Sequence, residues 1–286
     1  MKYMFALIVL LSMLITSTSQ AENVSTLEQI KKSESIRIGY RENEPPMSFL
    51  NEDKQPIGYS IELCLRIANE VKSRLKNPNI AIKYVPVTSS NRFESLANNS
   101  IDILCGSTTK TLSRAELIDF TQLSFVTGAS LLSLKETEVD EISDLKGKKV
   151  AVVKDTTTLA TLTKALKKNE NDAKIIPVSS AKEGMDAVTK GNVDSFASDQ
   201  VILIGLAITH ENPEKFMIAK EIFSYEPFAL AVRQNDSEFR LIANRVLSEL
   251  NRSGQINSIY SRWFGQITKE MPSLLEAMYI LNSTSE

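Results

Sequence analysis

One short stretch of the chain concentrates side chains that capture anions. Residues 105–114 contain one glycine, five serine or threonine hydroxyls and an arginine, Arg114. The apolar residues 101–104 before it, interrupted only by Asp102, predict a short buried strand that ends beside Gly106. Backbone N–H groups at such an end, together with the hydroxyls and a planar guanidinium, suit a carboxylate. A hydroxyl-rich turn with a solvated arginine fits the same residues.

An earlier strand pattern ends in a second arginine. Residues 36–40 alternate as a strand that delivers Arg41. Residues 42–46 carry two prolines, which remove donors and fix the backbone, so we expect neither helix nor strand there. Open α/β sheets place ligand-binding residues at the carboxyl ends of their strands. The alternative for Arg41 is a surface salt bridge to Glu42 or Glu44.

A third arginine, Arg92, follows the predicted strand 80–87 and a short polar run. Ser90 could be a simple N-cap here, with Arg92 solvated in the first turn of a helix. However, Arg41 and Arg92 both follow strand ends, and Arg114 belongs to the hydroxyl-rich stretch. The pattern therefore favours a shared anion site over three unrelated surface arginines.

The later strand patterns lead into helix starts. Residues 149–153 predict a strand, and the helix after it has either Asp155 or Thr156 as its N-cap. Free N–H groups and the positive end of the dipole allow such a start to hold an anion without a basic side chain. The predicted strand 193–197 precedes Asp199, which could cap the next helix or pair with a ligand ammonium group.

Strands and helices alternate along the whole chain. This order predicts the α/β class, with sheets that carry helices on both faces. The length of 286 residues is enough for two domains of ordinary size. We expect Glu226 and Pro227 to interrupt a strand region at 216–232, and two helices, 236–251 and 255–264, to end the folded part.

The N-terminus has the pattern of a secretory signal peptide. Residues 1–21 carry one basic residue, Lys2, then an apolar core and small residues at the expected cleavage point. No later stretch approaches 18 uninterrupted apolar residues. We therefore expect a soluble mature protein that is exported to the periplasm.

Composition argues against several kinds of partner. The formal net charge is −2 and no block of lysine or arginine occurs, which argues against nucleic acid and anionic membranes. The single histidine, His210, leaves too few ligands for a metal centre, so we expect no metal. The two cysteines, Cys64 and Cys105, could pair in an oxidising compartment, and the sequence leaves open whether they do.

The chain resembles a known family over most of its predicted mature length. The matching motifs lie at residues 36–41, 87–92, 105–109 with Arg114, 144–148 and 191–194. They are similar to the periplasmic solute-binding proteins of amino-acid ABC importers, and within these to the branch that binds glutamate and aspartate. The most specific piece is Cys-Gly-Ser-Thr-Thr followed by Arg114.

The resemblance implies a type II periplasmic-binding-protein fold, in which two lobes joined by two crossing strands close on a ligand. Lobe 1 would comprise residues 22–129 and 227–286, and lobe 2 residues 130–226. The resemblance also implies a monomer without catalytic residues or cofactor. It would bind L-glutamate or L-aspartate and deliver it to the membrane permease of an ABC transporter.

Eight residues of this chain match binding positions of the family. Those implied for the α-carboxylate are Arg114, Thr109 and Thr157. Those implied for the α-ammonium group are Asp199 and Ser107. Those implied for the side-chain carboxylate are Arg41, Ser89 and Arg92.

One position departs from the branch that binds glutamate and aspartate. That branch has a histidine near the side-chain carboxylate, whereas this chain has Ala181, so the preference between the two ligands stays open. The three arginines opposed by Asp199 alone leave two unbalanced positive charges. This count predicts that acidic amino acids bind at least about a hundredfold tighter than their amides.

Two other functions occur on this fold. Periplasmic dehydratases of prephenate-like acids also bind carboxylates with arginines, but they need a general acid or base in the cleft. The candidates here are Glu42, Glu44 and Asp199. The sensor lobe of a receptor needs a membrane span after the domain, and residues 265–286 contain none.

Overall fold

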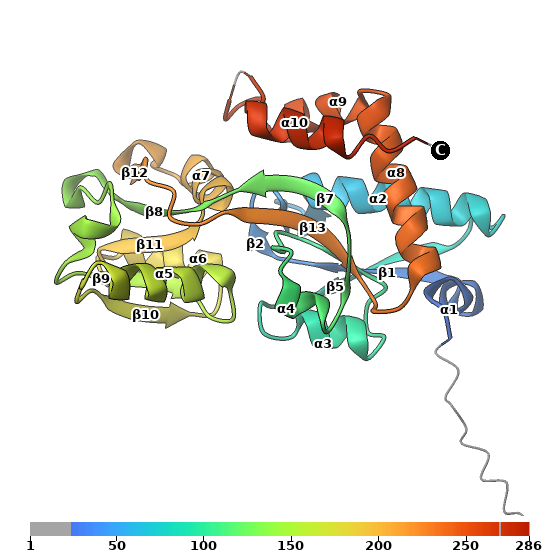
Figure 1. Cartoon of the computed structure of the whole chain (residues 1–286), viewed down its shortest axis with the longest axis horizontal. Coiled ribbons are helices and arrows are strands. Elements are labelled where there is room, and N and C mark those ends of the chain that lie inside the picture. The colour runs from blue at the N-terminus through green and yellow to red at the C-terminus, as the bar shows by residue number, and fades with distance from the viewer. Residues whose placement is uncertain (1–23, 269, 286) are drawn as a thin grey trace, which may run out of the picture.

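The computed structural model describes residues 24–268 and 270–285. The predicted signal peptide, residues 1–21, lies outside this range. Within the described range, no helix has both the length and the apolar character needed to cross a membrane. Two halves lie side by side along the long axis of the molecule, each built around its own sheet (Figure 1).

The first sheet has the strand order β5-β1-β6-β13-β7. Its strands are β1 (Ser35–Tyr40), β5 (Ala81–Pro86), β6 (Ile103–Cys105), β7 (Asp119–Thr127) and β13 (Glu226–Val232). Strand β1 is parallel to β5 and to β6, whereas β13 is antiparallel to β6 and β7. A small separate sheet follows β1 and comprises β2 (Asn43–Glu44), β3 (Ser48–Leu50) and β4 (Pro56–Ile57).

The second sheet has the order β10-β9-β11-β8-β12. Its strands are β8 (Ala129–Leu134), β9 (Lys149–Val153), β10 (Lys174–Val178), β11 (Ser195–Asp199) and β12 (Phe216–Ile218). Here β9 is parallel to β10 and β11, and β8 is antiparallel to β11 and β12. The two sheets therefore share one plan. Three parallel strands come first, then one antiparallel strand (β13 or β8), and then an edge strand that runs antiparallel to that one (β7 or β12).

Helices cover both sheets. The α-helices are α1 (Thr26–Ser33), α2 (Tyr59–Arg74), α3 (Arg92–Ala97), α4 (Leu112–Ala115), α5 (Thr157–Lys168), α6 (Ala181–Thr189), α7 (Gln200–Ile208), α8 (Ser237–Arg252), α9 (Gln255–Phe264) and α10 (Ser273–Leu281). Short 3₁₀ turns occupy Lys135–Thr137, Ile142–Leu145 and Pro213–Lys215. Apolar residues at helical spacing explain these faces; for example, α5 buries Leu162 and Leu166 against the second sheet.

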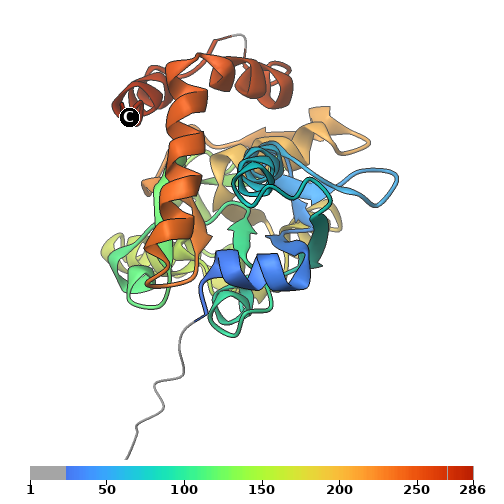
Figure 2. The same ribbon diagram turned by 90° about the vertical axis from the view of Figure 1, so that its right-hand side faces the viewer.

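The C-terminal helices α9 and α10 lie at the end of the first half opposite α1 (Figure 2). They close an aromatic core around Tyr59, which packs edge to face on Phe125 and Phe264. The Tyr59 hydroxyl lies 2.7 Å from that of Tyr279 on α10 and donates to the carbonyl of Ser124 at 2.8 Å. These contacts fix α10, a helix that the sequence pattern did not predict.

The two halves are joined where β7 leads into β8 and where the chain returns through β13, and these strands lie side by side (Figure 1). Ala129 begins a strand of the second sheet, and Glu226 begins a strand of the first. The predicted lobe limits, after residues 129 and 226, fall beside this junction and stay a prediction. The expected interruption at Glu226 and Pro227 is wrong, because both residues belong to β13. A proline is tolerated there because β6 pairs only with Ala231 and Val232, further along the strand.

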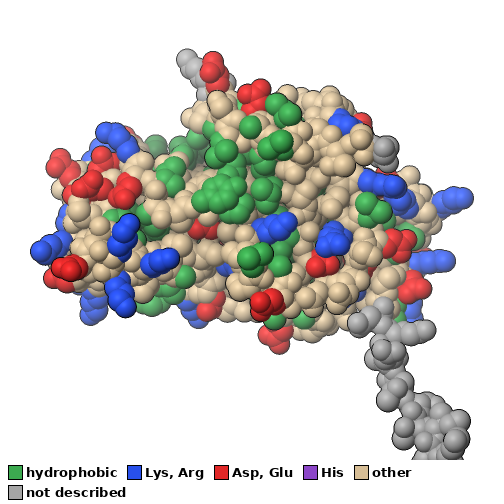
Figure 3. Space-filling view, in the orientation of Figure 1, with side chains coloured by type: hydrophobic (Ala, Val, Ile, Leu, Met, Phe, Trp, Pro, Cys, Tyr) green, Lys and Arg blue, Asp and Glu red, His purple; other side chains and the backbone are tan. Residues whose placement is uncertain are grey.

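An apolar groove lies on the far side of this junction from α5, and apolar side chains gather there between α10 and the second half (Figure 3). Its lining includes Ile204, Tyr225 and Leu274. Tyr225, the residue before β13, lines this groove, whereas the next residue, Glu226, hydrogen-bonds to Thr109 and Thr157 of the polar cavity described next.

Candidate ligand-binding site

The first sheet brings three loops together at one edge. Tyr40, the last residue of β1, is paired with Pro86 of β5 on one side and with Cys105 of β6 on the other. Because these strands are parallel, Arg41, the loop before Arg92 and the loop after Cys105 all leave the same edge. The sequence prediction that these strand ends converge agrees with the structure.

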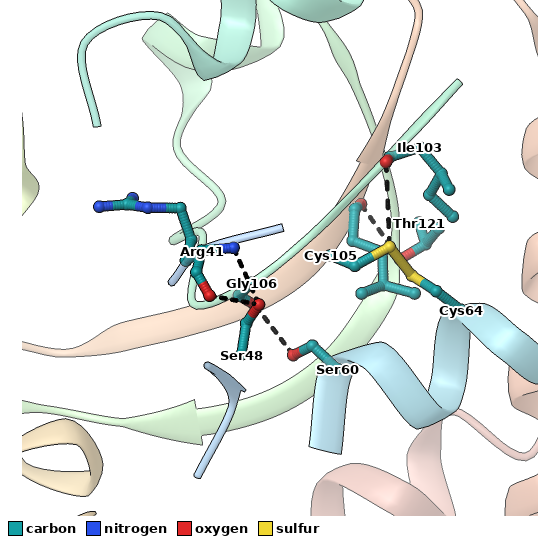
Figure 4. The surroundings of a disulfide bond; sticks show 9 residues. Arg41, Ser48, Ser60, Cys64, Ile103, Cys105, Gly106 and Thr121 are labelled. Carbon is teal, nitrogen blue, oxygen red and sulfur yellow. Dashed lines mark hydrogen bonds between the residues drawn. A yellow bond between two sulfur atoms is a disulfide. The ribbon is translucent and has the colours of Figure 1, made fainter. Parts of the chain in front are cut away.

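The loop after β6 is anchored to helix α2. A disulfide joins Cys105 to Cys64 of α2, and the Ser60 hydroxyl donates to the carbonyl of Gly106 at 2.9 Å (Figure 4). The side chain of Arg41 points away from the disulfide (Figure 4). Gly106 leaves room for it, since a Cβ there would lie 2.9 Å from Cγ of Arg41. The disulfide thus holds the hydroxyl loop in place and does not itself face the cavity.

The second sheet presents helix starts to the same space. Thr156 is the N-cap of α5, and its hydroxyl accepts from the backbone N–H of Leu159. Asp155, the other candidate cap, instead has a left-handed φ of 58° and accepts a hydrogen bond from the Ser90 hydroxyl. Asp199 is the N-cap residue of α7, but its side chain makes no capping hydrogen bond. Its carboxylate is therefore available for another partner.

These segments enclose a small cavity between the two halves. The volume open to the centre of a water molecule is about 30 Å³, which is room for one or two waters. The cavity in this arrangement is therefore too small for a molecule the size of an amino acid. Seven of the eight predicted site residues line the cavity: Arg41, Arg92, Ser107, Thr109, Arg114, Thr157 and Asp199. The eighth, Ser89, is buried beside Arg92, and its backbone carbonyl accepts a hydrogen bond from the Arg92 guanidinium. Ala181 also lines the wall.

The three arginines differ in how they are held. Arg114 donates to the carbonyl of Thr109 at 2.8 Å. Arg92 donates to carbonyls of Ser89 and Asp155 and lies over the ring of Phe93, 4.5 Å from its centroid. Among the described residues, neither arginine has a carboxylate partner at hydrogen-bond distance.

Arg41 forms an ion pair with Glu44, at 2.9 Å between Nη2 and Oε1. The side chains of Arg41 and Glu44 are only 11% and 12% exposed, so this pair lies inside the cavity wall and is no surface salt bridge. Ser107 donates to the other oxygen of Glu44 at 2.6 Å. Glu44 is a cavity residue that the sequence prediction missed as a ligand-site residue.

A second missed carboxylate is Glu226. Its Oε2 accepts hydrogen bonds from Thr109 at 2.6 Å and from Thr157 at 2.8 Å, and its Oε1 accepts from Ser224 at 2.6 Å. Glu226 is 1% exposed and lies directly behind the two threonines of the cavity wall. One carboxylate therefore connects a threonine of the first half with a threonine of the second.

These two glutamates correct the charge count. Two carboxylates, Glu44 and Asp199, line the cavity opposite the three arginines, and Glu226 lies behind the wall. The excess positive charge is therefore smaller than the sequence count, which considered Asp199 alone. The expected hundredfold preference for acidic amino acids loses this basis.

Three buried polar atoms in this region have no hydrogen-bond partner in the described part of the chain: Ser89 Oγ, Arg92 Nε and Asp199 Oδ1. Two are donors at the Arg92 end, and one is an acceptor at the head of α7. Orphaned buried polar groups are uncommon because each costs about 1–3 kcal/mol. Their placement suits a ligand with an anionic group at one end and an ammonium group at the other.

The electrostatics of the site favour the same kind of ligand. Burial, followed by the charges of Glu226 and Glu44, raises the pKa of Asp199 well above its usual value. Burial, followed by the charges of Arg41 and Arg114, lowers the pKa of Arg92 to about 9. Burial also lowers the pKa of Arg114. A cation beside Asp199 and an anion beside the arginines would relieve these shifts.

The fold and the site define a solute-binding protein. Residues 36–266 match the model of the bacterial extracellular solute-binding proteins, family 3, and the chain belongs to this family. The family and the fold class expected from the sequence are thereby confirmed.

Two curated relatives carry a similar name. An L-glutamate/L-aspartate-binding protein of Pseudomonas aeruginosa is 31% identical over 246 residues, which is 86% of this chain and 82% of the relative. A glutamate/aspartate import solute-binding protein of Salmonella typhimurium is 30% identical over 84% of this chain and 80% of its own length.

Solved structures share the fold but differ in ligand. A cysteine-binding protein from Campylobacter jejuni has a TM-score of 0.76 and 24% identity, and covers 87% of this chain and 97% of its own. An ancestral arginine-binding protein bound to glutamine has a TM-score of 0.73 and 26% identity, over 81% of this chain and 98% of its own. The likeness to these structures therefore leaves the choice of ligand to the side chains of the cavity.

Proposed function

We propose that this protein binds L-glutamate or L-aspartate in the cavity between its halves and delivers it to the membrane permease of an ABC importer. The observation that carries the proposal is the set of buried polar atoms without partners, two donors at Arg92 and Ser89 and one acceptor at Asp199. An acidic amino acid supplies the complementary groups at both ends. The names of the Pseudomonas and Salmonella relatives support the same ligand class.

The proposed contacts follow the positions of the side chains. The α-carboxylate is held by Arg114, with the hydroxyl loop at Thr109 and the start of α5 at Thr157 on either side. The α-ammonium group pairs with Asp199, helped by Ser107. The side-chain carboxylate lies at Arg92, Ser89 and Arg41.

Closure of two lobes around the hinge at β7 and β13 completes this site, because Arg114 belongs to the first sheet's half and Asp199 to the second sheet's half. The lobes are residues 22–129 with 227–286 and residues 130–226. The protein acts in the periplasm as a monomer after removal of residues 1–21, and it needs no cofactor.

A thermal-shift screen with the twenty amino acids tests the proposal. A ligand at a hundred times its dissociation constant adds about 2.7 kcal/mol to the free energy of unfolding. We expect L-glutamate and L-aspartate to raise the midpoint by several degrees, and L-lysine and L-leucine to leave it unchanged. The proposal fails if no acidic amino acid raises the midpoint or if L-lysine raises it as much.

Catalysis is the second candidate, because the raised pKa of Asp199 is a property of general acids. We propose binding without turnover. The described residues offer no base within hydrogen-bond distance of Asp199 Oδ1. Incubation with prephenate, followed by absorbance of an aromatic product, should show no conversion above a blank without protein.

A further inference from the structure

Glu44 is a carboxylate placed inside a site proposed to bind carboxylates. Its two oxygens are occupied by Arg41 at 2.9 Å and by the Ser107 hydroxyl at 2.6 Å. Both partners are themselves residues that we propose for the ligand. An anionic group that binds to Arg41 or Ser107 would therefore lie next to the negative charge of Glu44.

The backbone keeps Glu44 in this position. Glu44 pairs with Ser48 in the small sheet, and its carbonyl accepts from the N–H of Met47 at 2.9 Å. The next residue, Pro45, lies against α7 of the other half, where a Cβ on Gly205 would be 2.1 Å from the Pro45 carbonyl oxygen. Glu42, two residues earlier, is exposed. Contacts within the small sheet and with α7 therefore hold Glu44 in the cavity wall.

The charge of Glu44 reaches the other groups of the site. It contributes to the raised pKa of Asp199, and it favours the charged form of Arg92. A ligand carboxylate between Arg92 and Arg41 would lie beside this negative charge, and like charges at close range disfavour each other. A ligand carboxamide would instead give its oxygen to Arg92 and donate an N–H to Glu44.

We propose that Glu44 is a specificity-determining residue. Its negative charge makes the difference in affinity between acidic amino acids and their amides smaller. Because Arg41 neutralises Glu44, Arg92 is left as the main contact of the ligand's side-chain end. The site then takes L-glutamine and L-asparagine as well as L-glutamate and L-aspartate. This inference rests on the proposed amino-acid-binding function.

Calorimetric titration of L-glutamate and L-glutamine into wild type, Glu44→Gln and Glu42→Gln tests it. The Glu44→Gln change keeps the shape and an acceptor for Ser107 but removes the charge. We expect the ratio of the glutamine to the glutamate dissociation constant to rise at least about tenfold, mainly through tighter glutamate binding. The Glu42→Gln control removes the same charge from the exposed side of the segment and should leave the ratio within about twofold.

A second pair of variants guards against an uninformative loss of folding. Arg41→Gln leaves Glu44 unpaired in the wall and should weaken glutamate binding about thirtyfold or more. The double variant Arg41→Gln with Glu44→Gln removes both charges and should recover most of that loss. Circular dichroism and the thermal midpoint of each variant show whether it is folded.

The outcomes separate the two proposals. If wild type binds neither glutamate nor glutamine, the proposed function is wrong, and this inference falls with it. If wild type binds them but Glu44→Gln leaves their ratio unchanged or lowers it, only the role of Glu44 is overturned. A double variant as weak as Arg41→Gln alone would also overturn that role, because the loss of affinity would then not come from the charge of Glu44.

Discussion

The two halves of this molecule share one strand order but contribute opposite chemistry to the cavity. The first half supplies all three arginines of the lining, whereas the lining residues from the second half include no lysine or arginine among those described. The second half instead supplies the start of α5 and the carboxylate of Asp199. The two halves therefore have the same strand order, but the first contributes arginine side chains to the cavity and the second contributes a helix start and a carboxylate.

This difference suggests an order of events. Arginine side chains attract an anion over several ångströms, whereas the partial charge of a helix start acts only within its first turn. An acidic amino acid should therefore bind first to the half that carries Arg114 and Arg92. We expect closure of the halves to bring α5 and Asp199 to the ligand afterwards. Substitutions that remove one contribution at a time from either half test this division of roles.

The largest effect is expected at Arg114. Replacing Arg114 by alanine removes the proposed charged contact of the α-carboxylate, a group that every amino acid shares. Loss of one member of a buried charge pair costs about 2–5 kcal/mol, so affinity for all ligands should fall about thirtyfold or more. Arg74→Ala, which removes an exposed arginine paired with Glu70, is the matched control. Calorimetry that gives the same dissociation constant for a folded Arg114→Ala variant as for wild type would refute the assignment.

Asp199→Asn should act on affinity and stability in opposite directions. The variant loses the charged partner of the ammonium group, which weakens a charge-assisted hydrogen bond and should cost about tenfold in affinity. It also removes a buried carboxylate whose Oδ1 has no partner in the described chain. The ligand-free protein should therefore gain about 1 kcal/mol, or a few degrees in midpoint. A variant that is less stable and binds normally contradicts both roles.

The raised pKa of Asp199 predicts a dependence of binding on pH. The ammonium group of the ligand pairs with the ionised form, so binding displaces the proton from any protonated Asp199. Affinity should fall as the pH is lowered, beginning above the usual aspartate pKa of about 3.9. The ligand-free protein should be stabilised over the same window, since its folded state binds the proton more tightly than the unfolded chain. Asp199→Asn should lose this part of the pH dependence, which calorimetry at several pH values can check.

The smallest effect on binding is expected from the disulfide. It lies within the first half and links α2 to the end of β6 without facing the cavity. Replacing both cysteines by serine should lower the free energy of unfolding by about 2–4 kcal/mol, because the unfolded chain loses a cross-link. Affinity for L-glutamate should stay within about twofold. A loss of binding with a native circular dichroism spectrum would show that the bond positions the ligand loop directly.

Much of the cavity could be predicted from the sequence because its residues follow strand ends. The apolar runs before Arg41 and Gly106 are local signals, and parallel strands bring their carboxyl ends to one edge. Thr157 and Asp199 carry the same signal in the second sheet, at the first turn of α5 and the head of α7. The set of eight site residues came from the family resemblance, and seven of them line this one cavity. Their roles toward a ligand remain proposals.

The two glutamates could not be predicted in the same way. Glu44 faces inward because a two-residue strand, β2, sets its direction, and the prolines beside it suggested no regular structure. The signal that was available is its alternation with the exposed Glu42. Glu226 was taken as a break between strands, whereas its burial depends on hydroxyls from both halves. The pairing of Cys64 with Cys105 likewise needed the packing of α2 on β6, which brings their Cα atoms to 6.4 Å.

The close approach of Gly205 and Pro45 sets a mechanical limit on the molecule. A backbone carbonyl of one half rests against a helix position without a side chain in the other half. Backbone atoms cannot be displaced by a change of rotamer, so we expect this contact to limit how closely the two halves can approach on that side of the cavity. The backbone contact then sets the smallest volume of the cavity. The size of the ligand sets how far apart the two halves remain. A ligand that is too long for the cavity should therefore hold Gly205 and Pro45 apart.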